Sequence, residues 1–304
     1  MVATSPVRPE APLHEAVARI TGMLRDAGVP SPAADARWLV QGIAGVDPHR
    51  HPDTPLPRAA LPALNDAVAR RAAREPLQLI LGTAPFRALE LVCRPGVFVP
   101  RPETEIVAGL AVDVAQRVGS PAPIVAEPCT GTGAIACAIA AEVPGARVIA
   151  TDRDPAAVHL ARHNADRVRR GVAGPPGFAR AATLTVQTGD LLDPLDPELR
   201  GHLDVLVANP PYLPADDRDS WAPEVAAHDP DTALVGGADG HEVVNALLTL
   251  AARWLAPGGT VILEIDERRG ADVAGAARHA GLSSIEVARD LTGADRAIVA
   301  RRPV

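Results

Sequence analysis

The sequence predicts an α/β protein: a doubly wound, mainly parallel seven-stranded sheet preceded by a small N-terminal helical domain. From residue 103 onward, short apolar runs alternate with longer segments of helical periodicity, the pattern of a parallel sheet covered by helices. One of these runs enters a glycine-rich turn that opens a helix, whereas the first 80 residues show helical spacing alone. With 304 residues, 47% of them hydrophobic, the chain has enough apolar material for one large or two medium domains.

A small helical bundle is expected in residues 1–80, because apolar residues recur there at helical spacing. The expected helices span residues 12–28, a segment from Ser31-Pro32 through Val40, and residues of about 57–74. An exposed face of this bundle is suited to binding a protein partner, although a lid or a dimer element fits the sequence equally well. Residues 81–100 are expected to form a β-hairpin connector to the main domain, residues 101–304.

In the main domain, helices are expected at 103–118, 133–142, 155–169, 240–255 and 267–280, and strands at 123–127, 147–151, 182–187, 203–208, 259–265, 284–289 and 295–301. Ligands of such sheets bind at the carboxyl ends of the strands. The Gly- and Pro-rich segment 171–180 is expected to be a flexible connection. The acidic segment 213–237 is either a loop that closes over the site or a solvated insertion.

A nucleoside-binding turn is indicated where the strand at 123–127 runs into Glu127-Pro128-Cys129-Thr130-Gly131-Thr132-Gly133. Glycines allow the backbone to bend sharply and approach a ligand closely. About 20 residues later the next strand ends at Asp152, whose carboxylate can bind a ribose diol. The same spacing satisfies the dinucleotide fingerprint, so a nicotinamide cofactor remains an alternative at this point.

Negative charge at the strand ends favours S-adenosylmethionine over a dinucleotide. Glu127 and Asp152 place carboxylates beside a ligand that would be a sulfonium cation. Asp190 follows the expected third strand, where the amine of an adenine can donate to it. A site for two phosphates would gain less from so many carboxylates.

The tetrapeptide Asn209-Pro210-Pro211-Tyr212 follows the buried strand at 203–208 and predicts a site for a planar –NH2 group. The side-chain carbonyl of Asn209 and the backbone carbonyl of Pro210 can each accept a hydrogen bond, while the prolines fix φ and bring no N–H donor. Tyr212, the single tyrosine of the chain, can stack on the flat group. Holding both N–H bonds of an amide or exocyclic amine directs the nitrogen lone pair at an electrophile. An ordinary turn at a strand end also uses Asn and Pro often.

In these motifs the chain resembles release-factor glutamine methyltransferases of the HemK type, which methylate the glutamine amide nitrogen of the Gly-Gly-Gln motif in peptide-chain release factors. The resemblance runs from about Arg74 to Arg302, and its most specific part is Phe98-Val99-Pro100-Arg101-Pro102-Glu103-Thr104-Glu105. It also includes the stretches 75–82, 209–212, 229–234 and 236–240. The resemblance implies a class I, Rossmann-like methyltransferase fold that uses S-adenosylmethionine, with a release factor as partner docked in part by the N-terminal helices.

Site residues follow from the motifs and the resemblance together. The expected cofactor contacts are Glu127, Cys129, Thr130, Gly131, Thr132, Gly133, Asp152, Asp190, Leu191 and Asn209. The expected substrate contacts are Phe98, Asn209, Pro210, Pro211 and Tyr212, with Asn209, Pro210 and Tyr212 as the catalytic residues. The sequence departs from the family pattern at Glu127-Pro128-Cys129, at Asp266 and at His228-Asp229. These departures leave open an amide or amine of a metabolite as acceptor.

Other functions are less compatible with the composition. The net charge of −7 offers no global attraction for nucleic acid, which argues against an exocyclic base amine as acceptor and against direct nucleic-acid binding. A nicotinamide-dependent oxidoreductase and a non-catalytic binding module remain alternatives from other classes. No apolar run is long enough for a membrane span, so a cytoplasmic protein is expected. His159 and His163 stand four apart without a third ligand, and no metal site is expected. The oligomeric state is not predicted.

Overall fold

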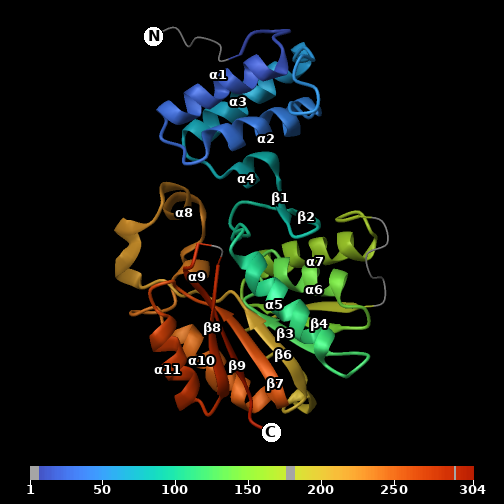
Figure 1. Ribbon diagram of the computed structural model, residues 1–304, viewed down its shortest axis with the longest axis vertical. Helices are drawn as coiled ribbons and strands as arrows, with labels where there is room; N and C mark the ends of the chain where they lie inside the picture. Colours follow the sequence, from blue (N-terminus) through green and yellow to red (C-terminus); the bar gives the residue numbers. More distant parts are fainter. Residues whose placement is uncertain (1–6, 176–181, 291) are drawn as a thin grey trace. The chain divides into compact units, whose positions relative to one another are not determined.

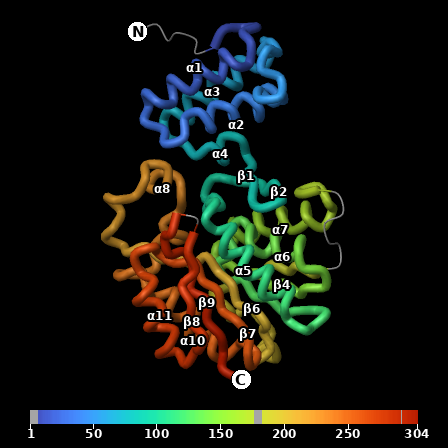
Figure 2. The backbone as a smooth tube through the Cα atoms, viewed as in Figure 1, coloured from blue at the N-terminus to red at the C-terminus, as the bar shows by residue number. Residues whose placement is uncertain are grey.

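The computed structural model describes residues 7–175, 182–290 and 292–304, which form two compact units (Figures 1 and 2). We call them the helical unit, made of the residues up to Thr83 together with Ala222–His228, and the sheet unit, made of Ala84–Trp221 and Asp229–Val304. The chain therefore passes between the units three times, and a short segment from the second half of the sequence belongs to the helical unit.

The N-terminal helices of the helical unit pack around one apolar core. Its helices are α1 (Leu13–Asp26), α2 (Pro32–Ala44), a 3₁₀ helix (Arg58–Ala60), α3 (Leu61–Ala72), α4 (Leu77–Leu81) and α8 (Pro223–His228). The apolar face expected for the first helix is the buried one, with Leu13, Ile20 and Leu24 inaccessible to solvent. The sequence did not predict α4 or α8, which are too short to show a helical period.

Helix α8 is held within the helical unit by partly buried ion pairs. The carboxylate of Glu224 accepts hydrogen bonds from Arg71 Nη2 at 2.9 Å and from Arg74 Nη2 at 2.6 Å. Arg71 also donates to Asp35 at 2.7 Å. Burial alone would raise the pKa of Glu224, but the hydrogen bonds from Arg74 and Arg71 outweigh burial and lower it to about 2. This part of segment 213–237 is thus a short helix that belongs to the helical unit.

The sheet unit confirms the predicted fold class. Its strands are β3 (Ile124–Pro128), β4 (Arg147–Asp152), β5 (Thr183–Thr188), β6 (Leu203–Ala208), β7 (Leu255–Glu264), β8 (Ser283–Arg289) and β9 (Asp295–Arg301). They form a seven-stranded sheet in the order β5-β4-β3-β6-β7-β9-β8, parallel except that β9 runs antiparallel to both neighbours. A separate two-stranded sheet pairs β1 (Thr83–Phe86) with β2 (Leu89–Val92) in the region expected to be a hairpin.

Helices cover both faces of the large sheet (Figure 1). Helices α5 (Thr104–Arg117), α6 (Ala134–Glu142) and α7 (Pro155–Arg169) share one core cluster with alternate strand residues such as Val125 and Val205. Helices α10 (Glu242–Trp254) and α11 (Gly270–His279) share the other with Ala126 and Leu206, one position further along the same strands.

Two further expectations concern the first residue of strand β7 and the connection at 171–180. Strand β7 begins at residue 255 instead of 259, because helix α10 ends at Trp254 and Leu255 already pairs with Leu203. Most of the flexible connection expected at 171–180 lies outside the described residues. Within the described ranges, no helix has the length and apolar character required to cross a membrane.

The strand order determines where a ligand site can form. Strands β3 and β6 are neighbours, yet the chain leaves β3 toward β4 on one side and reaches β6 only after β5. A crevice at the carboxyl ends of strands arises at such a reversal. The residues that follow β3, β4 and β6 therefore converge on one place.

Candidate active site

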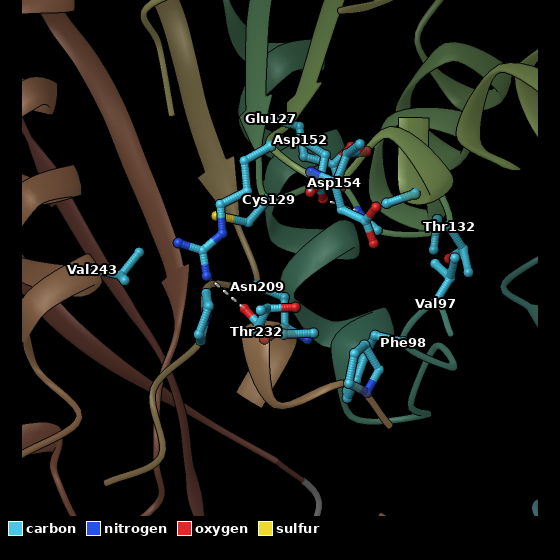
Figure 3. A pocket seen from close by; sticks show the side chains of 18 of the residues that line it. Val97, Phe98, Glu127, Cys129, Thr132, Asp152, Asp154, Asn209, Thr232 and Val243 are labelled. Atoms are coloured by element: carbon cyan, nitrogen blue, oxygen red, sulfur yellow. Dashed lines mark hydrogen bonds between the residues drawn. The ribbon is translucent and has the colours of Figure 1, made fainter. Parts of the chain in front are cut away.

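A cavity of about 270 Å³ opens at the carboxyl ends of β3, β4, β5 and β6, and all of its lining residues belong to the sheet unit (Figure 3). Of the residues expected from the sequence, those that line it are Phe98, Glu127, Cys129, Thr130, Gly131, Thr132, Asp152, Asp190, Leu191, Asn209 and Pro211. The sequence thus located most of the expected site residues, and a substantial part of the cavity wall, from motifs at successive strand ends.

Three expected site residues do not line the cavity: Gly133, Pro210 and Tyr212. Gly133 begins helix α6 with a φ of +79°, and a Cβ atom there would lie 3.1 Å from the Cβ of Ala161 on α7. A glycine at this position therefore lets the glycine loop pass close to α7. Pro210 is buried behind the wall, and the hydroxyl of Tyr212 lies 3.3 Å from Glu264 Oε1, to which it donates.

Glu127, at the end of β3, is a buried carboxyl group with only 2% of its surface exposed. Its Oε2 accepts hydrogen bonds from Thr130 Oγ1 at 2.6 Å and from the backbone N–H of Ala136 at 2.9 Å. Burial raises the pKa of Glu127 to about 8, against the lowering effect of these two donors. At neutral pH this group is therefore largely protonated until a cation arrives beside it.

Asp152, at the end of β4, is hydrogen-bonded to the glycine loop. Its Oδ2 accepts from the N–H of Gly131 and its Oδ1 from the N–H of Asp154, both at 2.9 Å. Burial raises the pKa of Asp152, and the two backbone donors oppose that rise. Because each oxygen has a second lone pair, the carboxylate can still accept from a ligand hydroxyl.

Asn209, directly after β6, has its carboxamide oriented by a neighbour from another element. Its Nδ2 donates to Thr104 Oγ1 at 3.3 Å, which leaves Oδ1 as the acceptor available to the cavity. Figure 3 shows Asn209 in the part of the cavity near Phe98, away from Glu127 and Asp152. The guanidinium of Arg101 lies 5.0 Å from the centre of the Phe98 ring and forms an ion pair with the buried Asp229.

Segment 213–237 also contributes to the cavity wall. Helix α9 (Asp231–Leu234) places Thr232 and Ala233 in the lining, and Arg153 Nη2 donates to the backbone carbonyl of Thr232 at 3.1 Å. Of the two expectations for this segment, a role at the site agrees with these contacts. The contact was not predicted from the sequence, because Arg153 and Thr232 are 79 positions apart and meet only in the folded structure.

The glycines at 236 and 240 lie against the turn that carries Asn209. A Cβ atom at Gly236 would be 2.4 Å from the carbonyl oxygen of Pro211, and one at Gly240 would be 2.4 Å from that of Tyr212. Both separations are shorter than any real contact, so only glycine lets the two segments approach this closely. The glycines of the stretch 236–240 therefore pack directly against the Asn-Pro-Pro-Tyr turn.

The charges of the cavity fit a cationic nucleoside better than a dinucleotide. Its wall carries the carboxyl groups of Glu127, Asp152, Asp154, Asp190 and Glu242, against the single guanidinium of Arg153. A pyrophosphate would meet a net negative wall, whereas a sulfonium and an ammonium group would be attracted. The donor set thus fits S-adenosylmethionine, as predicted from the sequence.

Comparisons with known proteins show what this chain is similar to. Residues 15–82 match the PrmC N-terminal domain. A release factor glutamine methyltransferase of Mycolicibacterium smegmatis is 44% identical over 293 residues, 95% of this chain and 98% of the relative. One of Streptomyces coelicolor is 41% identical over 84% of this chain and 86% of the relative. A solved structure of a release factor-specific protein-(glutamine-N5) methyltransferase from Alicyclobacillus acidocaldarius is 25% identical, with a TM-score of 0.39, over 68% of this chain and 95% of that one.

Proposed function

The chain belongs to the release factor glutamine methyltransferase family, and on this premise we propose that it methylates the side-chain amide nitrogen (N5) of the glutamine in the Gly-Gly-Gln motif of a peptide-chain release factor. The observation that carries the proposal concerns Asn209, which lines a cavity walled by carboxyl groups and whose Nδ2 is engaged by Thr104, so that Oδ1 remains as the acceptor. The family supports a bacterial release factor as partner, and we place the reaction in the cytoplasm.

S-adenosylmethionine is the cofactor of this family, and when bound it supplies a methyl group activated by a positively charged sulfur. Asp152 would bind the ribose hydroxyls, and Asp190 would accept from the adenine amine. Glu127 and the loop from Cys129 to Thr132 would surround the cationic end. Each of these residues lines the cavity and is held by the sheet or by backbone hydrogen bonds.

The acceptor amide would be held by two carbonyl oxygens. Asn209 Oδ1 would accept one N–H bond. We assign the second N–H bond to the backbone oxygen of Pro210, as expected from the sequence, although Pro210 is not among the residues that line the cavity. Holding both N–H bonds would fix the plane of the amide and direct the nitrogen lone pair toward the methyl donor. Phe98 and Pro211 supply apolar surface that excludes water from the cavity. Tyr212 would support this turn through Glu264 and would not stack on the substrate as the structure stands.

The proposed chemistry requires orientation more than a strong base. An amide nitrogen is a weak nucleophile because its lone pair is delocalised, and fixing both N–H bonds raises the fraction of reactive orientations. After transfer the nitrogen carries an extra proton, which becomes acidic enough for water to accept it.

The test is methyl transfer from S-adenosylmethionine carrying a labelled methyl group to a purified bacterial release factor. We expect one label per molecule, located by mass spectrometry on the glutamine of the Gly-Gly-Gln motif. The matched control is the same release factor with that glutamine replaced by alanine, which should remain unlabelled. Label that appears on the control, or only on DNA or a free amide, would overturn the proposal.

Cofactor binding should strengthen as the pH rises. Burial raises the pKa of Glu127 to about 8, so below that pH the free protein carries a proton that a bound cation expels. The affinity should therefore increase between pH 6 and pH 8, by up to about tenfold per pH unit, and level off above pH 8. Calorimetric dissociation constants at each pH measure this slope. Glu127→Gln should have the shallower slope, and equal slopes in the two proteins would contradict the assignment.

A further inference from the structure

Four polar side chains from three parts of the fold meet at the Asn-Pro-Pro-Tyr turn, which we call the acceptor turn. Asn209 and Tyr212 belong to this turn after β6, Thr104 begins α5 and also lines the cavity, and Glu264 ends β7. Thr104 and Glu264 are each 3% exposed. The sequence analysis gave neither of them a role in the reaction.

Two hydrogen bonds and one further contact connect these side chains. Asn209 Nδ2 donates to Thr104 Oγ1 at 3.3 Å, and Tyr212 donates to Glu264 Oε1 at 3.3 Å. The Thr104 hydroxyl is also close enough to the carboxyl group of Glu264 to lower the pKa of that group. Among the described residues, the buried Oε2 of Glu264 has no hydrogen-bond partner of regular geometry, so it can accept the proton of the Thr104 hydroxyl.

The ionisation of Glu264 determines which group donates and which accepts in each of these contacts. An ionised carboxylate can only accept hydrogen bonds, so Thr104 must donate its single proton to Glu264. The Thr104 oxygen is then left to accept, and the group of Asn209 that can donate to it is the –NH2. The carboxamide is thereby turned with Oδ1 toward the cavity, where it meets an –NH2 donor and not an acceptor.

We propose that Thr104 and Glu264 are positioning residues, which form a one-way hydrogen-bond chain that keeps Asn209 an acceptor and so selects a primary amide nitrogen as substrate. The inference rests on the proposed function of the site. If the carboxylate became a donor, Thr104 could donate to Asn209 Oδ1 and the carboxamide would present its –NH2 to the substrate. The amide of the substrate would then face another donor, which is repulsive.

Charged groups around Glu264 decide when it is ionised. Burial raises the pKa of Glu264 to about 7, while hydrogen bonds from Thr104 and Tyr212 oppose the rise. Glu103, beside Thr104 on α5, raises the pKa further, and Arg296 on β9 lowers it. Asp266, two residues beyond Glu264, acts on Tyr212. The chain should therefore have its productive direction above pH 7 and lose it as the pH falls below 7.

The experiment compares Thr104→Val, Thr104→Ser and Glu264→Gln with the wild type, with labelled methyl transfer to release factor as the readout. Thr104→Val removes the hydroxyl at nearly constant volume and should lower kcat about tenfold, whereas Thr104→Ser should retain most of it. Glu264→Gln brings an –NH2 donor into the chain and should lower kcat about thirtyfold. In the wild type kcat, measured at saturating cofactor, should fall below pH 7, and this inflection should be absent in Glu264→Gln.

Matched controls are Thr249→Val on the exposed side of α10 and Glu286→Gln on the exposed side of β8, which should leave kcat unchanged. Dissociation constants for S-adenosylmethionine, measured by calorimetry, should stay within about threefold in all variants, which shows that each is folded with an intact cavity. Full activity of Thr104→Val and Glu264→Gln, or an inflection kept in Glu264→Gln, would overturn the inference. A wild type inactive toward release factor would instead overturn the proposed function.

Discussion

Replacing Asn209 by alanine is expected to lower kcat for methyl transfer by about a thousandfold, the upper range for loss of one oriented hydrogen-bonding group at a reacting centre. The change removes Oδ1, the one side-chain acceptor that the acceptor turn presents to the cavity, and leaves the substrate amide free to rotate. The cofactor carboxylates lie on other strand ends, so the dissociation constant of S-adenosylmethionine should change no more than a few-fold. Single-turnover transfer and calorimetry measure the two quantities.

A matched control is Asn245→Ala on the exposed side of α10, which loses the same atoms away from the cavity and should transfer normally. Retention of full turnover by Asn209→Ala would remove the central hypothesis about the acceptor site. Loss of cofactor affinity in parallel with turnover would instead indicate that Asn209 acts mainly through the cofactor.

Replacing Asp152 by alanine is expected to raise the dissociation constant of S-adenosylmethionine about a hundredfold. The carboxylate accepts the N–H groups of Gly131 and Asp154, each a charge-assisted hydrogen bond worth about 1.5–3 kcal/mol, and its loss also removes the acceptor for the ribose. The glycine loop would then have to be ordered by the cofactor itself. Calorimetry on the purified variant measures the effect, and kcat at saturating cofactor should fall much less.

Two further variants sharpen this result. Asp152→Asn keeps one acceptor oxygen without the charge, so its affinity should lie between those of the wild type and the alanine variant. Asp216→Ala, an exposed aspartate outside the cavity lining, should bind normally. An unaltered dissociation constant in Asp152→Ala would show that the end of β4 does not hold the nucleoside.

The fold was predictable because its information is local. Most strands of the large sheet are apolar runs flanked by helical segments, and much of the order of elements follows from that alternation. The elements that the sequence did not reveal are the short ones, such as α4 with five residues and α8 with six. Glu224 of α8 is held by the distant residues Arg71 and Arg74, and contacts of this kind leave no period in the sequence.

The site was predictable to the extent that it lies at strand ends. Glu127, Asp152, Asp190 and Asn209 each follow a strand, and parallel strands bring such positions together. The contact between Thr104 and Glu264 was not predictable from the sequence, because the two residues are 160 positions apart and meet only in the folded structure. Whether the ring of Tyr212 faces the cavity or the interior depends on Glu264 in the same way.

The anchoring of Glu224 limits how this protein can be recombined with its relatives. Exchanging residues 1–83 alone for those of a homologue would deprive the carboxylate of the two arginines that neutralise it, unless the donor supplies equivalents. An unpaired carboxylate would then remain on the stretch that joins the Asn-Pro-Pro-Tyr turn to helix α9. A functional hybrid should therefore take residue 224 and residues 1–83 from the same parent. A hybrid that takes them from different parents would leave the segment after the acceptor turn without its anchor.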